Sequence, residues 1–128
     1  MVVADTDVLI DALEGEREPA RARIDALTRR GELATTAVNL FELTGGRRTT
    51  VHRLELIHAA LGPVPVLSVT RGAAELAAAT RRYLERRGEG IGAADYLVAG
   101  VCIAHGFPLL TRNVQHFARV PGLDLAPL

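Results

Sequence analysis

The chain has 128 residues, of which 48% are apolar, and its fifteen acidic residues balance fifteen basic ones. This length suits one domain with a substantial core, and the apolar content excludes a disordered chain. A net charge of zero excludes the general attraction for polyanions that a strongly basic protein has, so any contact with nucleic acid must be local. We therefore expect a single domain over residues 1–128.

The basic residues are all Arg, and the chain contains no Lys and one cysteine, Cys102. One cysteine excludes an intrachain disulfide and favours a reducing compartment. The amino-terminal residues lack the basic region and the long apolar stretch of a signal peptide. The longest apolar run, residues 93–104, is shorter than the roughly 20 residues of a membrane span and contains Asp95. These features predict a cytoplasmic protein that has no contact with a membrane.

The first half of the chain alternates between short β-branched runs and segments with helical spacing of apolar residues. Strands are predicted at residues 2–4 and 33–36. Helices are predicted where apolar residues recur three and four positions apart before a glycine. These helices cover residues 8–14, 20–30, 38–44 and 51–61.

The second half continues the alternation. Residues 64–69 predict a strand, in which Pro65 favours an edge position or the start of the strand. Thr70 is typical of the residue that caps a helix, and the helix after it ends in the pairs Arg81-Arg82 and Arg86-Arg87, which suit the carboxyl end of a helix. Residues 93–105 predict a buried helix, because they are apolar on nearly every side. Residues 108–111 predict a fourth strand, and residues 123–125 a possible fifth.

Strands that alternate with helices predict a parallel sheet, because parallel neighbours need crossover connections. The expected fold class is therefore α/β, a three-layer sandwich around a mostly parallel sheet of four or five strands. Ligands of such sheets bind beyond the carboxyl ends of the strands. That end of the sheet is where a functional site is expected.

Four polar residues are placed to meet at this end of the sheet. Asp5 ends the first strand, Glu42 lies in the helix after the second, Asp95 opens the buried helix, and Asn113 follows the fourth strand. Each has a purely structural explanation as well. Asp95 could cap its helix, and Glu42 could lie on a solvent-exposed helix face. Acids at strand ends often cap the next turn, and Asp7 could be the N-cap of the helix that starts at Val8.

The combination of Asp5, Glu42 and Asp95 is more informative than any one acid. Two carboxylates about 4 Å apart repel by about 4 kcal/mol at an effective dielectric constant of about 20, so three must protonate, separate or bind a cation. A cluster of oxygen ligands without His or Cys suits Mg²⁺ or Mn²⁺. Such an ion could polarise a phosphodiester and activate water.

Four motifs of the chain together resemble the PIN domain, and specifically the VapC toxins of prokaryotic toxin–antitoxin pairs. They occur in the same order and cover nearly the whole chain. The motifs are Val3-Ala4-Asp5-Thr6-Asp7-Val8-Leu9-Ile10, Phe41-Glu42-Leu43, Gly92-Ala93-Ala94-Asp95-Tyr96-Leu97-Val98-Ala99 and Leu110-Thr111-Arg112-Asn113-Val114-Gln115-His116-Phe117.

The resemblance implies that Asp5, Glu42 and Asp95 are Mg²⁺ ligands of an endoribonuclease that prefers single-stranded RNA. It places the Thr6 hydroxyl near the waters of the metal. The fourth family position is often Asp, whereas this chain has Asn113. An amide has no ionic charge and cannot act as a base, so Asn113 is expected to orient water or a carboxylate, and a second metal becomes doubtful.

The resemblance further implies that Thr111 and Arg112 contact the substrate or position other groups. It also implies a homodimer, an RNA substrate and a cognate VapB-like antitoxin that blocks the site. The identity of the RNA stays open, because the same acidic centre could cleave tRNA, rRNA or mRNA. His116 is expected to help close the loop after the fourth strand rather than to take part in catalysis.

Two other functions are compatible with part of the pattern. In a phosphatase of the haloacid-dehalogenase type, Asp5 would be the nucleophile and Asp7 the acid or base. That chemistry normally uses a Lys, which this chain lacks. The second alternative is an interaction module that keeps the fold without catalysis, although the presence of all three acids disfavours it.

Overall fold

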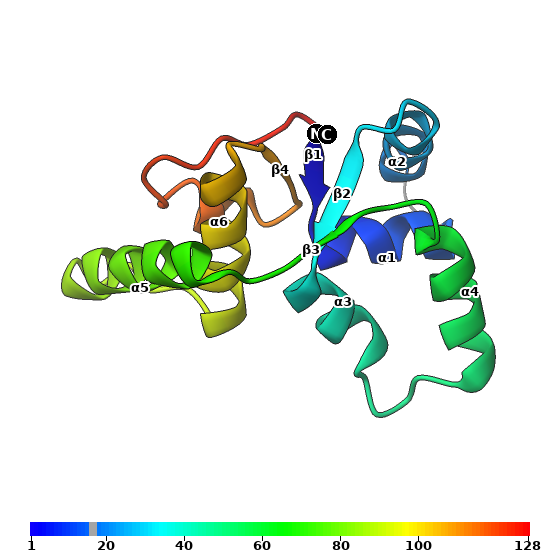
Figure 1. The fold of residues 1–128 in the computed structure, drawn as a ribbon, viewed down its shortest axis with the longest axis horizontal. Helices are drawn as coiled ribbons and strands as arrows, with labels where there is room; N and C mark the ends of the chain where they lie inside the picture. The colour runs from blue at the N-terminus through cyan, green and yellow to red at the C-terminus, as the bar shows by residue number, and fades with distance from the viewer. Residues whose placement is uncertain (16–17) are drawn as a thin grey trace.

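The computed structural model describes residues 1–15 and 18–128, in which strands and helices alternate (Figure 1). The elements are β1 (Val2–Ala4), α1 (Thr6–Glu14), α2 (Ala20–Arg29), β2 (Leu33–Thr36), α3 (Ala37–Thr44), α4 (Val51–Leu61), β3 (Val66–Leu67), α5 (Arg71–Arg86), α6 (Ala93–His105), β4 (Leu109–Leu110) and α7 (Val114–Phe117). Along the described residues, no helix is long and apolar enough to cross a membrane.

The strands form one sheet in the order β3-β2-β1-β4, and every pairing is parallel. The expectation for Pro65 is confirmed, since it precedes the edge strand β3 and its carbonyl accepts from Thr35 N at 3.0 Å. The possible fifth strand at residues 123–125 is wrong. Leu125 makes only an isolated bridge to Leu109, so four strands are present in the described part of the chain.

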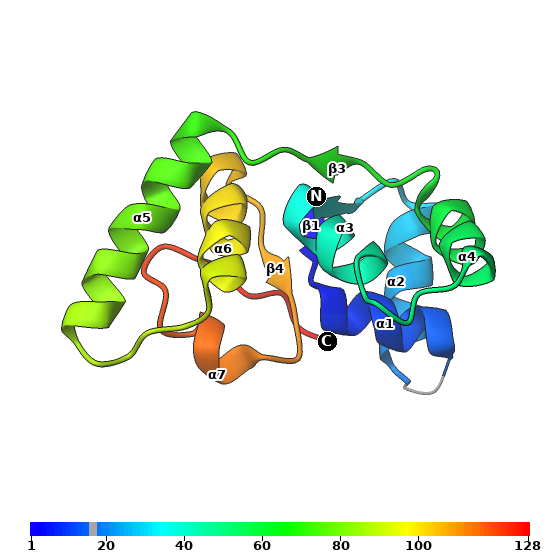
Figure 2. The same cartoon turned by 90° about the horizontal axis from the view of Figure 1, so that it is seen from below.

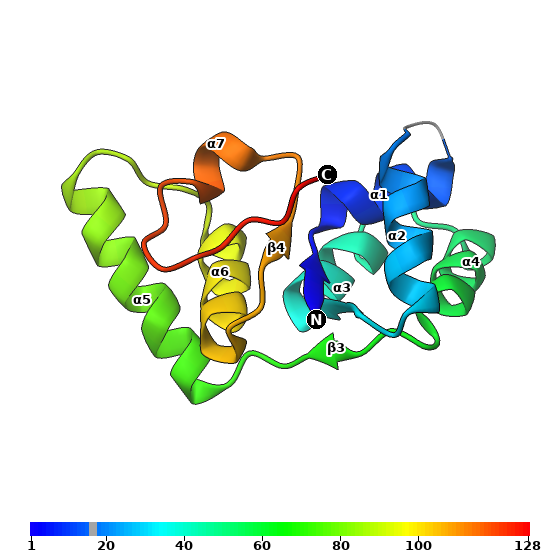
Figure 3. The same ribbon diagram turned by 90° about the horizontal axis from the view of Figure 1, so that it is seen from above.

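Helices cover both faces of the sheet, which confirms the three-layer α/β sandwich. Successive side chains of a strand point to opposite faces. Val3, Ala34 and Leu109 accordingly pack with α5 and α6. Their neighbours in the same strands, Ala4, Leu33 and Leu110, pack with α1, α2 and α4. Figures 2 and 3 show α5 and α6 on one side of the strands and α1, α2 and α4 on the other.

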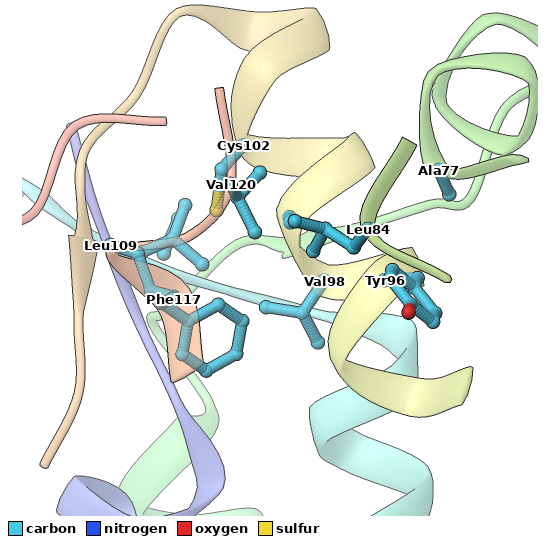
Figure 4. Packing of buried hydrophobic residues seen from close by; sticks show 11 residues of the cluster. Ala77, Leu84, Tyr96, Val98, Cys102, Leu109, Phe117 and Val120 are labelled. Atoms are coloured by element: carbon cyan, nitrogen blue, oxygen red, sulfur yellow. The ribbon is translucent and has the colours of Figure 1, made fainter. Parts of the chain in front are cut away.

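The core between the sheet and α6 is centred on Phe117 and Leu109, which are completely buried (Figure 4). Phe117 is the last residue of α7. The sequence did not predict α7, because a single turn is too short to give a periodic pattern. Helix α6 also packs tightly on α5. A Cβ atom at Gly100 would lie 2.3 Å from the carbonyl oxygen of Ala73, so only glycine fits there without a shift of the backbone.

Threonine and aspartate side chains cap the amino-terminal ends of several helices. Thr36 caps α3 and Thr70 caps α5, each by accepting a hydrogen bond from the N–H three residues later. The expectation that Asp7 is the N-cap of a helix from Val8 is wrong. Helix α1 begins at Thr6, and Asp5 is the cap, because Asp5 is the last residue with extended backbone.

Candidate active site

The three acids of the predicted site lie at one end of the sheet. Asp5 directly follows β1, Glu42 lies in α3, which follows β2, and Asp95 lies in the first turn of α6. Figure 1 shows that α1, α3 and α6 begin at this same end of the molecule. Parallel strands bring the starts of their following helices together, so distant parts of the chain meet here.

Asp5 is held rigidly, because its exposed fraction is 7% and both carboxylate oxygens accept hydrogen bonds. Oδ1 accepts from Thr6 N and from Asn39 Nδ2, each at 2.9 Å. Oδ2 accepts from Thr111 Oγ1 at 2.7 Å. Burial raises the pKa of the Asp5 carboxyl, the donated hydrogen bonds oppose this rise, and the negative charge of Glu42 adds to it. Asp5 is thus both the N-cap of α1 and a fixed acceptor at the site.

Glu42 is exposed, but its carboxylate points into the site rather than to solvent alone. Its Oε1 accepts a hydrogen bond from the Thr6 hydroxyl at 2.9 Å. Thr6 therefore lies between Asp5 and Glu42. A Glu on a purely solvated helix face would not make this contact.

Asp95 is partly buried and faces the other two acids. Burial raises the pKa of the Asp95 carboxyl, the charges of Asp5 and Glu42 raise it further, and the nearby His116 lowers it. Gly92, not Asp95, is at the N-cap position of α6. Among the described residues, no side-chain hydrogen bond caps this helix, which disfavours a capping role for Asp95.

The donor chemistry of the three carboxylates fits a hard divalent cation, because their negative charges lie close enough to raise the pKa of Asp5 and of Asp95, and all their ligand atoms are oxygen. In the described part of the chain, no group of three or more His, Cys, Asp or Glu side chains is arranged closely enough to coordinate a metal ion as it stands. The exposed Glu42 carboxylate is held by the Thr6 hydroxyl. The buried Asp5 is held by its donors.

Asn113 contacts residues of its own loop. Its Nδ2 lies 3.0 Å from His116 Nδ1, and its backbone N–H donates to Thr111 Oγ1 at 3.0 Å. This contact agrees with the expectation that His116 helps to close the loop after β4. Thr111 is the residue of this loop that contacts Asp5.

Arg112 fastens the same loop to α1. Its Nε lies 2.7 Å from Asp11 Oδ2, and its backbone N–H donates to Asp7 Oδ2 at 3.0 Å. Asp7 also accepts from Thr111 at 3.3 Å, so its carboxylate anchors the loop. This arrangement gives Asp7 a structural role and disfavours the acid or base role that a phosphatase would require.

Asn39, which no sequence motif singled out, is fully buried and contacts the site. Asn39 donates to both Asp5 and Thr6, and Thr36 supports it from the end of β2. A Thr followed three residues later by a polar amide is a helix-start signal similar to a capping box. That spacing could have identified Thr36 and Asn39 as a pair.

The chain is similar to known proteins over nearly its whole length. A family model for the PIN domain matches residues 2–123. Ribonuclease VapC19 of Mycobacterium tuberculosis is 31% identical over 124 residues, which cover 97% of this chain and 98% of the relative. Ribonuclease VapC10 of the same organism is 34% identical over 117 residues, which cover 91% and 86%.

Solved structures have the same fold. The DNA-bound VapBC from Salmonella typhimurium aligns with a TM-score of 0.86 and 24% identity, over 98% of this chain and 96% of that chain. VapBC2 from Rickettsia felis, bound to a DNA fragment from its promoter, aligns with a TM-score of 0.84 and 20% identity, over 98% of each chain. At these identities, the likeness demonstrates the shared fold.

Proposed function

Because the chain belongs to the PIN domain family and, within it, to the VapC ribonucleases of toxin–antitoxin systems, we propose that it cleaves RNA at Asp5, Glu42 and Asp95. Nucleases of this kind depend on a divalent metal, and we propose Mg²⁺, with Mn²⁺ as a substitute. The observation that carries the proposal is that carboxylates from three separate elements lie close together at the carboxyl end of the sheet, where the charge of Glu42 raises the pKa of Asp5 and the charges of Asp5 and Glu42 raise the pKa of Asp95.

Each residue of the site has its own role. Asp5 supplies a buried oxygen that its donors hold, and Glu42 supplies an oxygen from an exposed side chain that the Thr6 hydroxyl contacts. Asp95 completes the set from α6. A bound divalent ion would neutralise these charges and polarise the scissile phosphate. Thr6 orients Glu42, and Thr111 orients Asp5. Asn113 acts through the loop that it shares with His116 rather than as a ligand.

The chain is further proposed to act in the cytoplasm as a homodimer with a VapB-like antitoxin. The solved neighbours are VapBC complexes, which supports a partner of that type. An apolar groove beside the acids supports a contact with another chain, because Phe41 is 74% exposed there. Ala37, Val38, Ala94 and Leu97 complete the groove. Light scattering, which measures the molar mass of the isolated chain in solution, tests whether it is a dimer.

The proposed activity is tested by incubating the purified chain with tRNA, rRNA and a synthetic single-stranded RNA, in Mg²⁺ or in EDTA. Cleavage is expected only with the metal, and it is expected to disappear in Asp5→Ala and Asp95→Asn. Glu55→Gln is the control, because Glu55 is exposed on α4. Cleavage that survives in EDTA would overturn the metal mechanism. Inactivity on every RNA would favour the interaction module.

The toxin role is tested in cells. Expression of the chain is expected to arrest growth, and Asp95→Asn is expected to relieve the arrest. Coexpression of the small open reading frame next to the gene should also relieve it. Hydrolysis of p-nitrophenyl phosphate that depends on Asp7 would support the phosphatase alternative instead.

A further inference from the structure

Asn39 lies in the first turn of α3, is completely buried, and contacts two residues of the acidic site at once. Its Nδ2 donates to Asp5 Oδ1 at 2.9 Å and to Thr6 Oγ1 at 3.0 Å. A primary amide has two N–H hydrogens, and here each of them has an acceptor. The donor capacity of the Asn39 side chain is therefore used entirely on the site.

Thr36 determines which way the Asn39 amide faces. The Thr36 hydroxyl donates to Asn39 Oδ1 at 2.7 Å and accepts from the Asn39 backbone N–H at 3.1 Å. A rotated amide would place its oxygen against the carboxylate of Asp5 and its NH₂ against a hydroxyl that needs an acceptor. Only the observed orientation satisfies every group.

The Asn39 amide also determines the direction of the Thr6 hydroxyl. Because Thr6 Oγ1 accepts from Asn39, its one hydrogen is left to donate, and it donates to Glu42 Oε1 at 2.9 Å. A continuous series of hydrogen bonds thus runs from Thr36 through Asn39 and Thr6 to Glu42. Asp5 branches from it at Asn39.

We propose that Asn39 is a positioning residue, which holds Asp5 directly and Glu42 through Thr6 in the orientations needed to bind the divalent ion. This inference rests on the proposed function, because it takes Asp5 and Glu42 as metal ligands. Hydrogen bonds behind the ligands of a metal fix their orientation, and the loss of such a bond typically costs roughly 10- to 100-fold in metal affinity or activity.

The first test compares Asn39→Ala with the wild-type chain. Calorimetric titration with Mn²⁺ in the absence of RNA measures the metal affinity, and cleavage assays measure kcat and KM. We expect Mn²⁺ binding and kcat to fall by roughly 10- to 100-fold. KM for the RNA should stay unchanged, since the side chain of Asn39 is buried and out of reach of a substrate at the surface.

The second test acts one step further from the metal. Thr36→Val removes the hydroxyl that orients Asn39 and keeps the shape of the side chain, whereas Thr36→Ser keeps the hydroxyl. We expect Thr36→Val to weaken Mn²⁺ binding and Thr36→Ser to recover most of that loss. Thr35→Val is the matched control, because Thr35 is equally buried but donates to the carbonyl oxygen of Ala4. It should lower only the melting temperature.

The outcomes separate the two proposals. If Asn39→Ala binds Mn²⁺ as tightly as the wild type while Asp5→Asn and Asp95→Asn lose it, the positioning role is wrong and the proposed function stands. If Asp5→Asn and Asp95→Asn also keep Mn²⁺ binding and cleavage, both proposals are wrong. If Asn39→Ala does not fold, the comparison of Thr36→Val with Thr36→Ser tests the positioning role. Equal losses of Mn²⁺ binding in Thr36→Val and in the control Thr35→Val would overturn that role.

Discussion

The hydroxyl of Thr111 donates to Asp5 Oδ2 at 2.7 Å, although these two residues lie near opposite ends of the chain. They meet because β4 pairs in parallel with β1, so that the residues after both strands lie side by side. Asn39, which follows β2 on the other side of β1, holds the second oxygen of Asp5. The orientation of Asp5 therefore depends on three strands being in register.

Replacing the acids is expected to separate activity from stability. Asp95→Asn should abolish cleavage and leave the metal-free melting temperature unchanged or higher, because it removes repulsion from Asp5 and Glu42. Asp5→Ala should abolish cleavage and lower the free energy of unfolding by about 1–3 kcal/mol, since it leaves buried donors unpaired. Urea denaturation in EDTA measures both. A strongly destabilised Asp95→Asn variant would indicate a capping role for Asp95.

The stability gained by Asp95→Asn is expected to depend on pH. The pKa of Asp95 is raised above its ordinary value of 3.8 by burial and by the charges of Asp5 and Glu42. A raised pKa means that the folded state holds the proton more tightly than the unfolded state. The contribution of Asp95 to stability is thus greatest below 3.8 and falls as pH rises through the folded pKa. The difference in unfolding free energy between Asp95→Asn and the wild type, measured in EDTA from about pH 4 to about pH 7, should grow with pH. A difference that shrinks would contradict the direction of the pKa shift.

Loss of the ion pair between Arg112 and Asp11 is expected to destabilise the loop after β4. Asp11 is only 7% exposed in this pair and Arg112 39%, so solvent screens the charges only in part. Arg112→Ala should lower the free energy of unfolding by about 1–2 kcal/mol, measured by urea denaturation. Arg71→Ala is the control, because its pair with Glu75 is exposed, and it should change stability by less than about 0.5 kcal/mol. Equal effects of the two variants would show that burial of Asp11 is unimportant.

A methyl group added at Gly100 is expected to disturb the packing of α6 on α5. The added Cβ would meet the carbonyl oxygen of Ala73 at 2.3 Å, so the two helices would have to move apart. Gly100→Ala should therefore lower the free energy of unfolding by about 1–3 kcal/mol. The same change at Gly72, where the nearest atom would lie 3.9 Å away, should raise it by up to about 1 kcal/mol through helix propensity. Thermal melts of the two variants should shift in opposite directions.

Cys102 is expected to resist modification in the folded protein. The thiol is completely buried, and burial raises the pKa of Cys102 to about 12. Because the thiolate is the reactive form, Ellman's reagent at about pH 8 should label the native chain slowly. The same reagent should label one thiol rapidly after unfolding in guanidinium chloride. Rapid labelling of the native chain would contradict the buried position.

The sequence by itself determined the order of the elements and the polar residues that end them. Apolar periodicity and capping residues act over a few neighbouring positions, so strands, helices and the places of Asp5, Glu42 and Asp95 could be read from short segments. The α/β sandwich followed from their alternation. The sequence pattern predicted a strand at residues 123–125, where the structure has only an isolated bridge, and it did not predict the single turn of α7. Strand pairing and single helical turns depend on contacts with distant parts of the chain.

Only the tertiary structure decided how the polar side chains are arranged around those acids. The sequence left both Asp5 and Asp7 as possible caps of α1, whereas the backbone places the N-cap at Asp5. It left Asn39 unnoticed, although the fold buries Asn39 against Asp5 and Thr6. The reason is that these hydrogen bonds join groups from separate strands and helices. Their directions follow from the register of a parallel sheet, which no local pattern of residues contains.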